Sequence, residues 1–118
     1  MVMVGMTITL GGLAFAAFWI GGHLDFVSGA AFSEGGHSLI CLPSTVDIQG
    51  QRISRISATL KPGACVTTPR HEVDVVVTEF GAAELALRSV EDRAEALIAI
   101  AHPDFRDELR EAWKQVGD

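Results

Sequence analysis

The sequence is poor in the residues that build disulfide frameworks and metal centres. It has two Cys and four His among 118 residues, and no Tyr. Cys41 and Cys65 form no CxxC pair and no secretory signature accompanies them, which favours reduced, buried thiols in a cytoplasmic protein. The His residues show neither HxH nor HExxH spacing, so the sequence predicts no metal site.

Positive charge is also scarce. The chain has 9 Lys and Arg against 15 Asp and Glu, a net charge of −6, and residues 1–51 contain no Lys or Arg. A general nucleic-acid binder needs a basic surface that neutralises phosphates. We therefore expect no nucleic-acid partner.

The first segment, Met1–Ile20, carries no charged side chain. An apolar run of this length is long enough to cross a bilayer as a helix, but the basic residues that flank a signal peptide or an anchor are missing. A second reading is a buried strand that ends in a turn at Gly11-Gly12. A third is the aberrant start of a truncated gene. We favour the buried segment and expect no membrane partner.

The composition as a whole is that of one globular domain, because 48% of residues are hydrophobic and 20% are charged. Residues 27–32 predict a short helix, ended by Glu34-Gly35-Gly36. Residues 44–51 are polar and predict a turn, and Lys61-Pro62-Gly63 predicts a second turn. Four segments have strand patterns: an interior strand over 38–42, a half-buried strand over 53–60, a strand over 64–68, and a central strand buried on both faces over 73–78.

Two helices are predicted at the end of the chain. Ser89 has the position of an N-cap, with Asp92 three residues later. Pro103 ends this helix and fits the first turn of the next, which Gly117 ends. Strands followed by helices indicate an α/β or α+β architecture.

Several motifs stand in order along residues 21–116. They are Gly21-Gly22-His23-Leu24-Asp25-Phe26, Leu42-Pro43-Ser44-Thr45, Ser54-Arg55-Ile56, Val66-Thr67-Thr68-Pro69-Arg70-His71-Glu72-Val73-Asp74, Val76-Val77-Thr78-Glu79-Phe80-Gly81, Ala83-Glu84-Leu85 and Ala96-Leu97-Ile98-Ala99-Ile100-Ala101-His102-Pro103-Asp104-Phe105-Arg106. Together they resemble the motifs of the acetyl-CoA hydrolase/transferase family, which includes acetate, succinate and 4-hydroxybutyrate CoA-transferases.

The resemblance covers the last part of the family's C-terminal domain. It implies an α/β fold: a partial CoA-transferase-type C-terminal domain, with a short mixed sheet and two C-terminal helices. Residues 1–20 are an apolar segment that does not match the family, and residues 21–118 form the partial domain. Family members are longer, with two related α/β domains. A cut domain exposes apolar surface, so we expect a homo-oligomer or an upstream-domain partner.

The chemistry that the resemblance implies is CoA transfer from an acyl-CoA to a small carboxylic acid, or acyl-CoA hydrolysis. The family works through a glutamyl-CoA thioester, and its Glu lies upstream of the glycine turn. Met1–Ile20 contains no Asp or Glu, so we expect no catalytic nucleophile in this chain. Whether the chain is active by itself is left open by the sequence. The alternative is a non-catalytic CoA-binding or subunit-interaction module.

The glycine turn is the part of the family's site that this sequence matches. Gly21 and Gly22 are the candidate CoA- and acyl-binding residues, because glycine lets the backbone approach a ligand closely. The alternative is that these glycines form a turn with a structural role only. Asp25 is a candidate supporting residue, either as an anchor that bonds local backbone N–H groups or as a site acid.

Three further residues are candidates for a supporting role. Arg70 and His71 follow a predicted strand and either meet CoA phosphates or form surface ion pairs, for example with Glu72 or Asp74. Glu79 follows the predicted central strand, where α/β sites gather. The resemblance makes Glu79 a structural, hydrogen-bonded carboxylate rather than the nucleophile.

Overall fold

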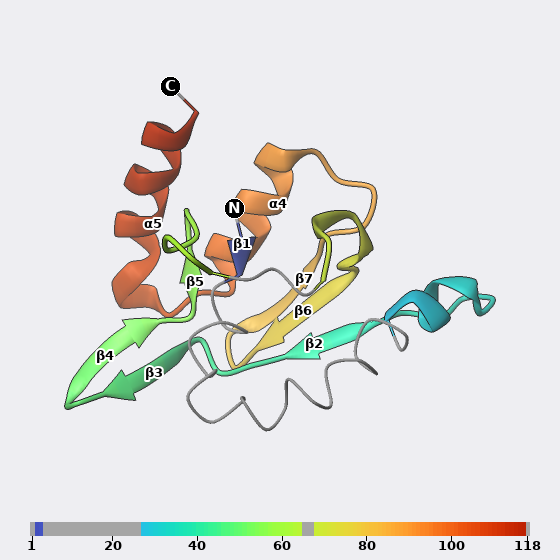
Figure 1. The fold of residues 1–118 in the computed structure, drawn as a ribbon, viewed down its shortest axis with the longest axis horizontal. Helices are drawn as coiled ribbons and strands as arrows, with labels where there is room; N and C mark the ends of the chain where they lie inside the picture. Colours follow the sequence, from blue (N-terminus) through green and yellow to red (C-terminus); the bar gives the residue numbers. More distant parts are fainter. Residues whose placement is uncertain (1, 4–26, 65–67, 118) are drawn as a thin grey trace.

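The computed structural model describes residues 2–3, 27–64 and 68–117. Its centre is a mixed three-stranded sheet of β2 (Leu39–Cys41), β6 (Val75–Thr78) and β7 (Gly81–Glu84), in the order β2-β6-β7. β2 is parallel to β6, and β7 is antiparallel to it. The helices α4 (Val90–Ala99) and α5 (Pro103–Val116) follow (Figure 1). The predicted α/β fold, with a short mixed sheet and two C-terminal helices, is confirmed.

The central strand is the one that the sequence predicts. β6 lies between β2 and β7, and Val75, Val76 and Thr78 are buried. α4 packs against β7 and α5, so the helices cover the sheet. The core cluster consists of Ile40, Ile56, Val76, Ala83, Leu85, Leu97, Ile98, Ile100, Ala101 and Leu109.

The prediction of an interior strand over 38–42 is corrected at two points. In the described part of the sheet β2 is an edge strand, and it alternates exposed, buried, exposed. Ile40 faces the core because side chains alternate along a strand. Leu39 and Cys41 therefore face away, and Cys41 is an exposed free thiol rather than a buried one. Cys65 lies outside the described residues.

A protruding hairpin replaces the predicted turn over 44–51. β3 (Thr45–Ile48) and β4 (Gln51–Ser54) pair antiparallel, and only Gln49 and Gly50 form the turn, with φ of 50° and 78°. Paired positive φ values are typical of the tight turn that suits hairpin twist. The strands contribute no buried residue, although Val46 and Ile48 alternate with Thr45 and Asp47 along β3.

The predicted strand over 53–60 is interrupted. β4 ends at Ser54, and β5 (Ile56–Ser57) pairs antiparallel with β1 (Val2–Met3). The hydroxyl of Ser54 donates to the carbonyl of Ile56 at 2.8 Å and accepts from the backbone N–H of Ile56 at 3.2 Å. These local bonds compete with the strand ladder.

The other local predictions have separate outcomes. Residues 27–32 are helical, and the N–H of Ala64 donates to the carbonyl of Lys61 in the predicted turn. Residues 65–67 lie outside the described residues, and their neighbours Ala64 and Thr68 are not in strands. Residues 4–20 also lie outside them. In the part of the chain that the structure describes, no helix is long and apolar enough to span a bilayer.

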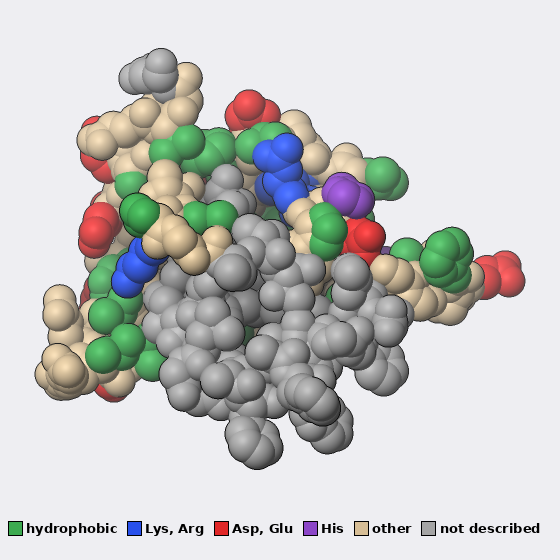
Figure 2. Space-filling model, in the orientation of Figure 1, with side chains coloured by type: hydrophobic (Ala, Val, Ile, Leu, Met, Phe, Trp, Pro, Cys, Tyr) green, Lys and Arg blue, Asp and Glu red, His purple; other side chains and the backbone are tan. Residues whose placement is uncertain are grey.

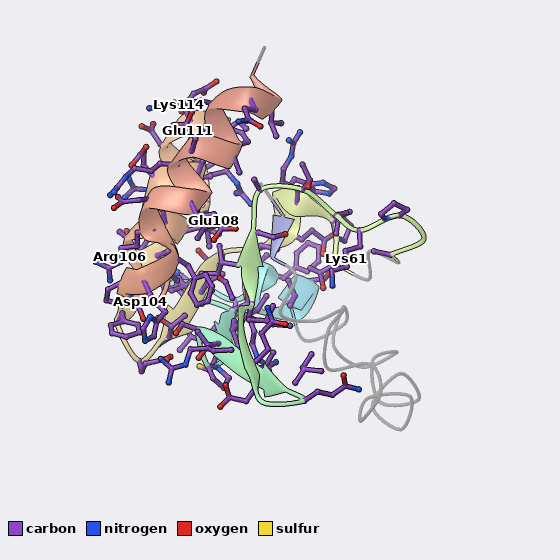
Figure 3. The ribbon with its side chains drawn as sticks, turned by 90° about the vertical axis from the view of Figure 1, so that its left-hand side faces the viewer. Lys61, Asp104, Arg106, Glu108, Glu111 and Lys114 are labelled. Carbon is purple, nitrogen blue, oxygen red and sulfur yellow. The ribbon has the colours of Figure 1, made fainter. Side chains whose placement is uncertain are left out.

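The N-cap of α4 and the proline in the first turn of α5 are as the sequence predicts. The Ser89 hydroxyl accepts from the N–H of Asp92 at 3.1 Å, and Pro103 occupies the first turn of α5, which Gly117 caps at its end. Charged side chains line the exposed face of α5 (Figure 3). Two ion pairs of 3.2 and 3.6 Å, Arg110–Asp107 and Lys114–Glu111, lie on this face.

Candidate functional site

The carboxyl ends of the two parallel strands are tied together by one carboxylate. Glu79 follows β6, and Ser44 follows β2. The Ser44 hydroxyl donates to Oε1 of Glu79 at 2.6 Å, and the Ser44 N–H donates to Oε2 at 2.9 Å. Ser44 is fully buried. These bonds lower the pKa of Glu79, the hydroxyl having the largest effect, while burial acts in the opposite direction. Glu79 is therefore held as an anion.

The turn between α4 and α5 contacts the carboxyl end of β6. The Thr78 hydroxyl donates to the carbonyl of Ile100 at 2.6 Å. The His102 ring contacts the Phe80 ring edge-to-face, with centroids 5.4 Å apart, and the guanidinium of Arg106 lies 5.7 Å from the Phe80 centroid. His102 also caps α5, because its Nδ1 accepts from the N–H of Asp104 at 3.2 Å. The sequence shows His102 only within a motif, although its place before Pro103 is a helix-cap signal.

A pocket lies at the opposite, amino end of β2 and β6. Its volume is about 420 Å³. Its wall is formed by the helical residues 27–32, the segment before β2, and η1 (Arg70–Glu72) with the residues that follow it. In Figure 2, apolar, His and acidic side chains lie beside the segment that projects to the right, with Lys or Arg side chains next to the His.

Two hydrogen-bonded pairs hold the pocket wall together. Nδ1 of His37 lies 2.8 Å from Oδ2 of Asp74, which also accepts from the N–H of Ser38 at 3.2 Å. The hydroxyl of Ser28 donates to Oε2 of Glu72 at 2.8 Å. Both pairs join residues far apart in the chain. Sequence reasoning missed them, since no local pattern marks partners 37 or 44 positions apart.

Among the described candidate residues, Arg70 and His71 lie apart from Glu79. Arg70 and His71 lie in η1, before β6, whereas Glu79 lies after it, at the other end of the strand. Gly21, Gly22 and Asp25 lie outside the described residues.

The contacts of Arg70 and His71 differ. Nε2 of His71 lies 3.8 Å from Oε1 of Glu72, and the His71 side chain is 80% exposed. The carbonyl of Arg70 accepts from Arg93 at 2.7 Å, and in the described segments its guanidinium forms no ion pair. The pairing with Asp74 considered from the sequence is not formed within those segments, where the partner of Asp74 is His37.

Metal ligation has no support in the described residues. Within residues 2–3, 27–64 and 68–117 no group of three or more His, Cys, Asp or Glu side chains is placed to hold an ion.

Comparison with known families shows to which family this chain belongs. The model of the acetyl-CoA hydrolase/transferase C-terminal domain matches residues 11–113. The chain belongs to the acetyl-CoA hydrolase/transferase family. The boundary that the sequence sets after residue 20 stays a prediction.

Named relatives of this family member are CoA-transferases and hydrolases. It is 59% identical over 95 residues to a probable butyrate:acetyl-CoA coenzyme A-transferase of Syntrophomonas wolfei, covering 80% of this chain and 21% of that protein. It is 49% identical over 96 residues to the 4-hydroxybutyrate coenzyme A transferase of Clostridium kluyveri, covering 81% and 22%. A hydrolase, the acetyl-CoA hydrolase of Candida albicans, is 34% identical over 95 residues, covering 80% and 17%.

Solved structures agree with the fold. RipA from Yersinia pestis superposes with a TM-score of 0.72 at 46% identity, covering 81% of this chain and 21% of that one. The 4-hydroxybutyrate CoA-transferase from Porphyromonas gingivalis superposes with a TM-score of 0.67 at 45% identity, covering 80% and 22%. The chain thus spans about a fifth of the length of the relatives that it matches.

Proposed function

We propose that this chain is part of an enzyme that moves CoA from an acyl-CoA to a small carboxylic acid, or hydrolyses the acyl-CoA. The observation that carries this is the family match over residues 11–113, joined to high identity with named CoA-transferases. CoA is then a substrate rather than a bound cofactor. We place the enzyme in the cytoplasm.

The reaction proceeds through a glutamyl-CoA thioester. A carboxylate nucleophile splits one acyl transfer into two easier steps, and the thioester then passes CoA to a carboxylic acid or is cleaved by water. The responsible Glu has no counterpart in this sequence. Glu79 is a poor substitute because both of its oxygens already accept hydrogen bonds from Ser44, which reduces their availability for attack.

The CoA-side contribution of this chain is the turn at Gly21-Gly22. Its backbone N–H groups would face the thioester oxygen, where donors stabilise developing negative charge. Asp25 anchors the turn by bonding nearby backbone N–H groups. Glu79 supports the site indirectly, by holding the segment after β2 to the end of β6.

The assay for this function measures CoA transfer from acetyl-CoA to succinate by the purified chain, together with its intact mass after incubation with acetyl-CoA. We expect no turnover and no CoA adduct, because the nucleophile is supplied from elsewhere. Turnover, or a CoA adduct on this chain, would contradict the claim that this chain lacks the nucleophile. The Glu79→Gln variant is the control that tells whether any adduct is on Glu79.

The second candidate is a non-catalytic module that binds CoA or another subunit. The chain matches only about a fifth of each relative's length, and this partial coverage favours a non-catalytic role as the second candidate. It differs in one outcome: the chain binds acetyl-CoA but restores no transfer when the remaining part of a family member is added. Restored transfer favours the enzyme.

A further inference from the structure

The pocket at the amino ends of β2 and β6 has the features of a ligand site. Its volume of about 420 Å³ falls within the range of small-molecule sites, about 300–1,000 Å³, which have mainly apolar walls and a few convergent polar groups. Val27, Ala31, Phe32, Val73 and Ala86 supply the apolar wall. Phe32 is 91% exposed, so an apolar ligand would cover it.

The charged side chains that line the pocket are acidic, and the hydroxyls of Ser28 and Ser38 add polar groups without charge. Two carboxylates, Glu72 and Asp74, line it together with His37 and His71, and no Lys or Arg does. Such a wall disfavours phosphates and carboxylates, because like charges repel strongly where water is partly displaced.

The hydrogen bonds already formed decide which ligand atoms fit. Nδ1 of His37 lies 2.8 Å from Oδ2 of Asp74, and because a carboxylate oxygen accepts, this ring nitrogen is the donor. Within the described residues no donor reaches Oδ1 of Asp74. The pocket therefore offers acceptors to a ligand that brings N–H groups on an uncharged, largely apolar body.

We propose that this pocket binds the uncharged, N–H-bearing part of CoA, and not its phosphates. This rests on the proposed function. Two parts of CoA have this chemistry: the pantetheine arm, with its amides, and the adenine ring, with its amino group. The helical residues 27–32 that line the pocket follow the Gly21-Gly22 segment closely in sequence. The pocket thus extends the CoA-side role of this chain beyond the glycine turn.

The test is an NMR titration of the full chain with three probes: pantetheine, adenosine, and adenosine 3′,5′-bisphosphate. A fragment of this size should bind in the millimolar range and shift the signals of Ala31 and Ala86. We expect one neutral probe to bind at least about tenfold more tightly than the bisphosphate. The neutral probe that binds more tightly identifies the part of CoA that occupies the pocket. Failure of both neutral probes to bind the folded chain overturns the proposal.

Matched variants locate the binding. Ala31→Trp fills the pocket from an exposed helical position, and Ala82→Trp places the same side chain on an exposed position of β7 outside it. Ala31→Trp should weaken binding about tenfold or more, and Ala82→Trp should leave it unchanged. Equal binding by both variants overturns the assignment to this pocket.

The outcomes also separate this proposal from the proposed function. Acetyl-CoA binding that Gly22→Val removes and Ala31→Trp leaves unchanged overturns the pocket and preserves the function. Conversely, a chain that takes the neutral fragments in the pocket but does not bind acetyl-CoA preserves the pocket and overturns the function.

Discussion

The Ser44 hydroxyl and N–H together bind both oxygens of the Glu79 carboxylate, at 2.6 and 2.9 Å. The two residues follow the parallel strands β2 and β6, so the pair ties these strands together where their ladder ends. Hydrogen bonds to a charged acceptor are stronger than bonds between neutral groups. The pair therefore joins the segment between β2 and β3 to the end of β6.

Removing the hydroxyl tests this pair. Ser44→Ala removes the donor at 2.6 Å from one Glu79 oxygen, and because Glu79 is exposed to solvent we expect a loss of about 0.5–1.5 kcal/mol in the free energy of unfolding. Urea unfolding measures it. Ser33→Ala, which removes an exposed hydroxyl bonded to the carbonyl of Ala30, is the matched control. An equal, small loss of stability in both variants would show that the Ser44–Glu79 hydrogen bond stabilises the fold no more than an exposed hydroxyl does.

The same pair predicts a pH dependence. The pKa of Glu79 is lowered from 4.5 in the folded state, mainly by the Ser44 hydroxyl. A lowered folded-state pKa adds stability that is present above the unfolded value and is lost as pH falls through the folded value. From neutral pH down through this window, the wild type should lose more stability than Glu79→Gln. Parallel curves in urea unfolding would contradict the lowered pKa.

The start of α4 allows a separate test. Ser89→Ala removes the acceptor for the N–H of Asp92 and should cost about 1 kcal/mol, whereas Ser89→Asp keeps a capping oxygen and should restore most of it. Thermal unfolding of the three proteins measures the difference. If Ser89→Asp is as unstable as Ser89→Ala, the cap does not explain the effect.

Two glycines should respond oppositely to the same substitution. Gly50 has φ of +78° in the hairpin turn, and Gly29 lies in the helical segment 27–32 with no positive φ. An added Cβ meets no atom within 4 Å at either position, so only backbone preference differs. Gly50→Ala should lose about 1–2 kcal/mol, and Gly29→Ala should gain up to about 1 kcal/mol. Effects of the same sign, measured by chemical unfolding, would contradict the turn geometry.

The sequence predicts the elements whose signals are local. β6 is an apolar, β-branched run, and α4 and α5 have recognisable capping residues in Ser89 and Pro103. The hairpin over Thr45–Ser54 escapes prediction because its strands are short and bury no residue. Val46 and Ile48 alternate with polar residues over only four positions, and Gly50 marks a turn without showing that strands flank it.

Pairings between distant segments are out of reach of pattern reasoning. The motifs containing Ser44 and Glu79 are both visible in the sequence, yet their hydrogen bond depends on β2 lying parallel to β6. His37 and Asp74 meet for the same reason, at the other end of these strands. The separation of Arg70 from Glu79 likewise follows from the length and direction of β6, which the motif spacing alone does not reveal.

Calorimetric titration of the full chain with acetyl-CoA tests the central claim most directly, with Gly22→Val as the comparison. A role on the CoA side of a family enzyme predicts saturable binding in the millimolar range or tighter, weakened about tenfold or more by the valine, which blocks close backbone approach. A folded wild-type chain that shows no binding at millimolar acetyl-CoA would contradict the account.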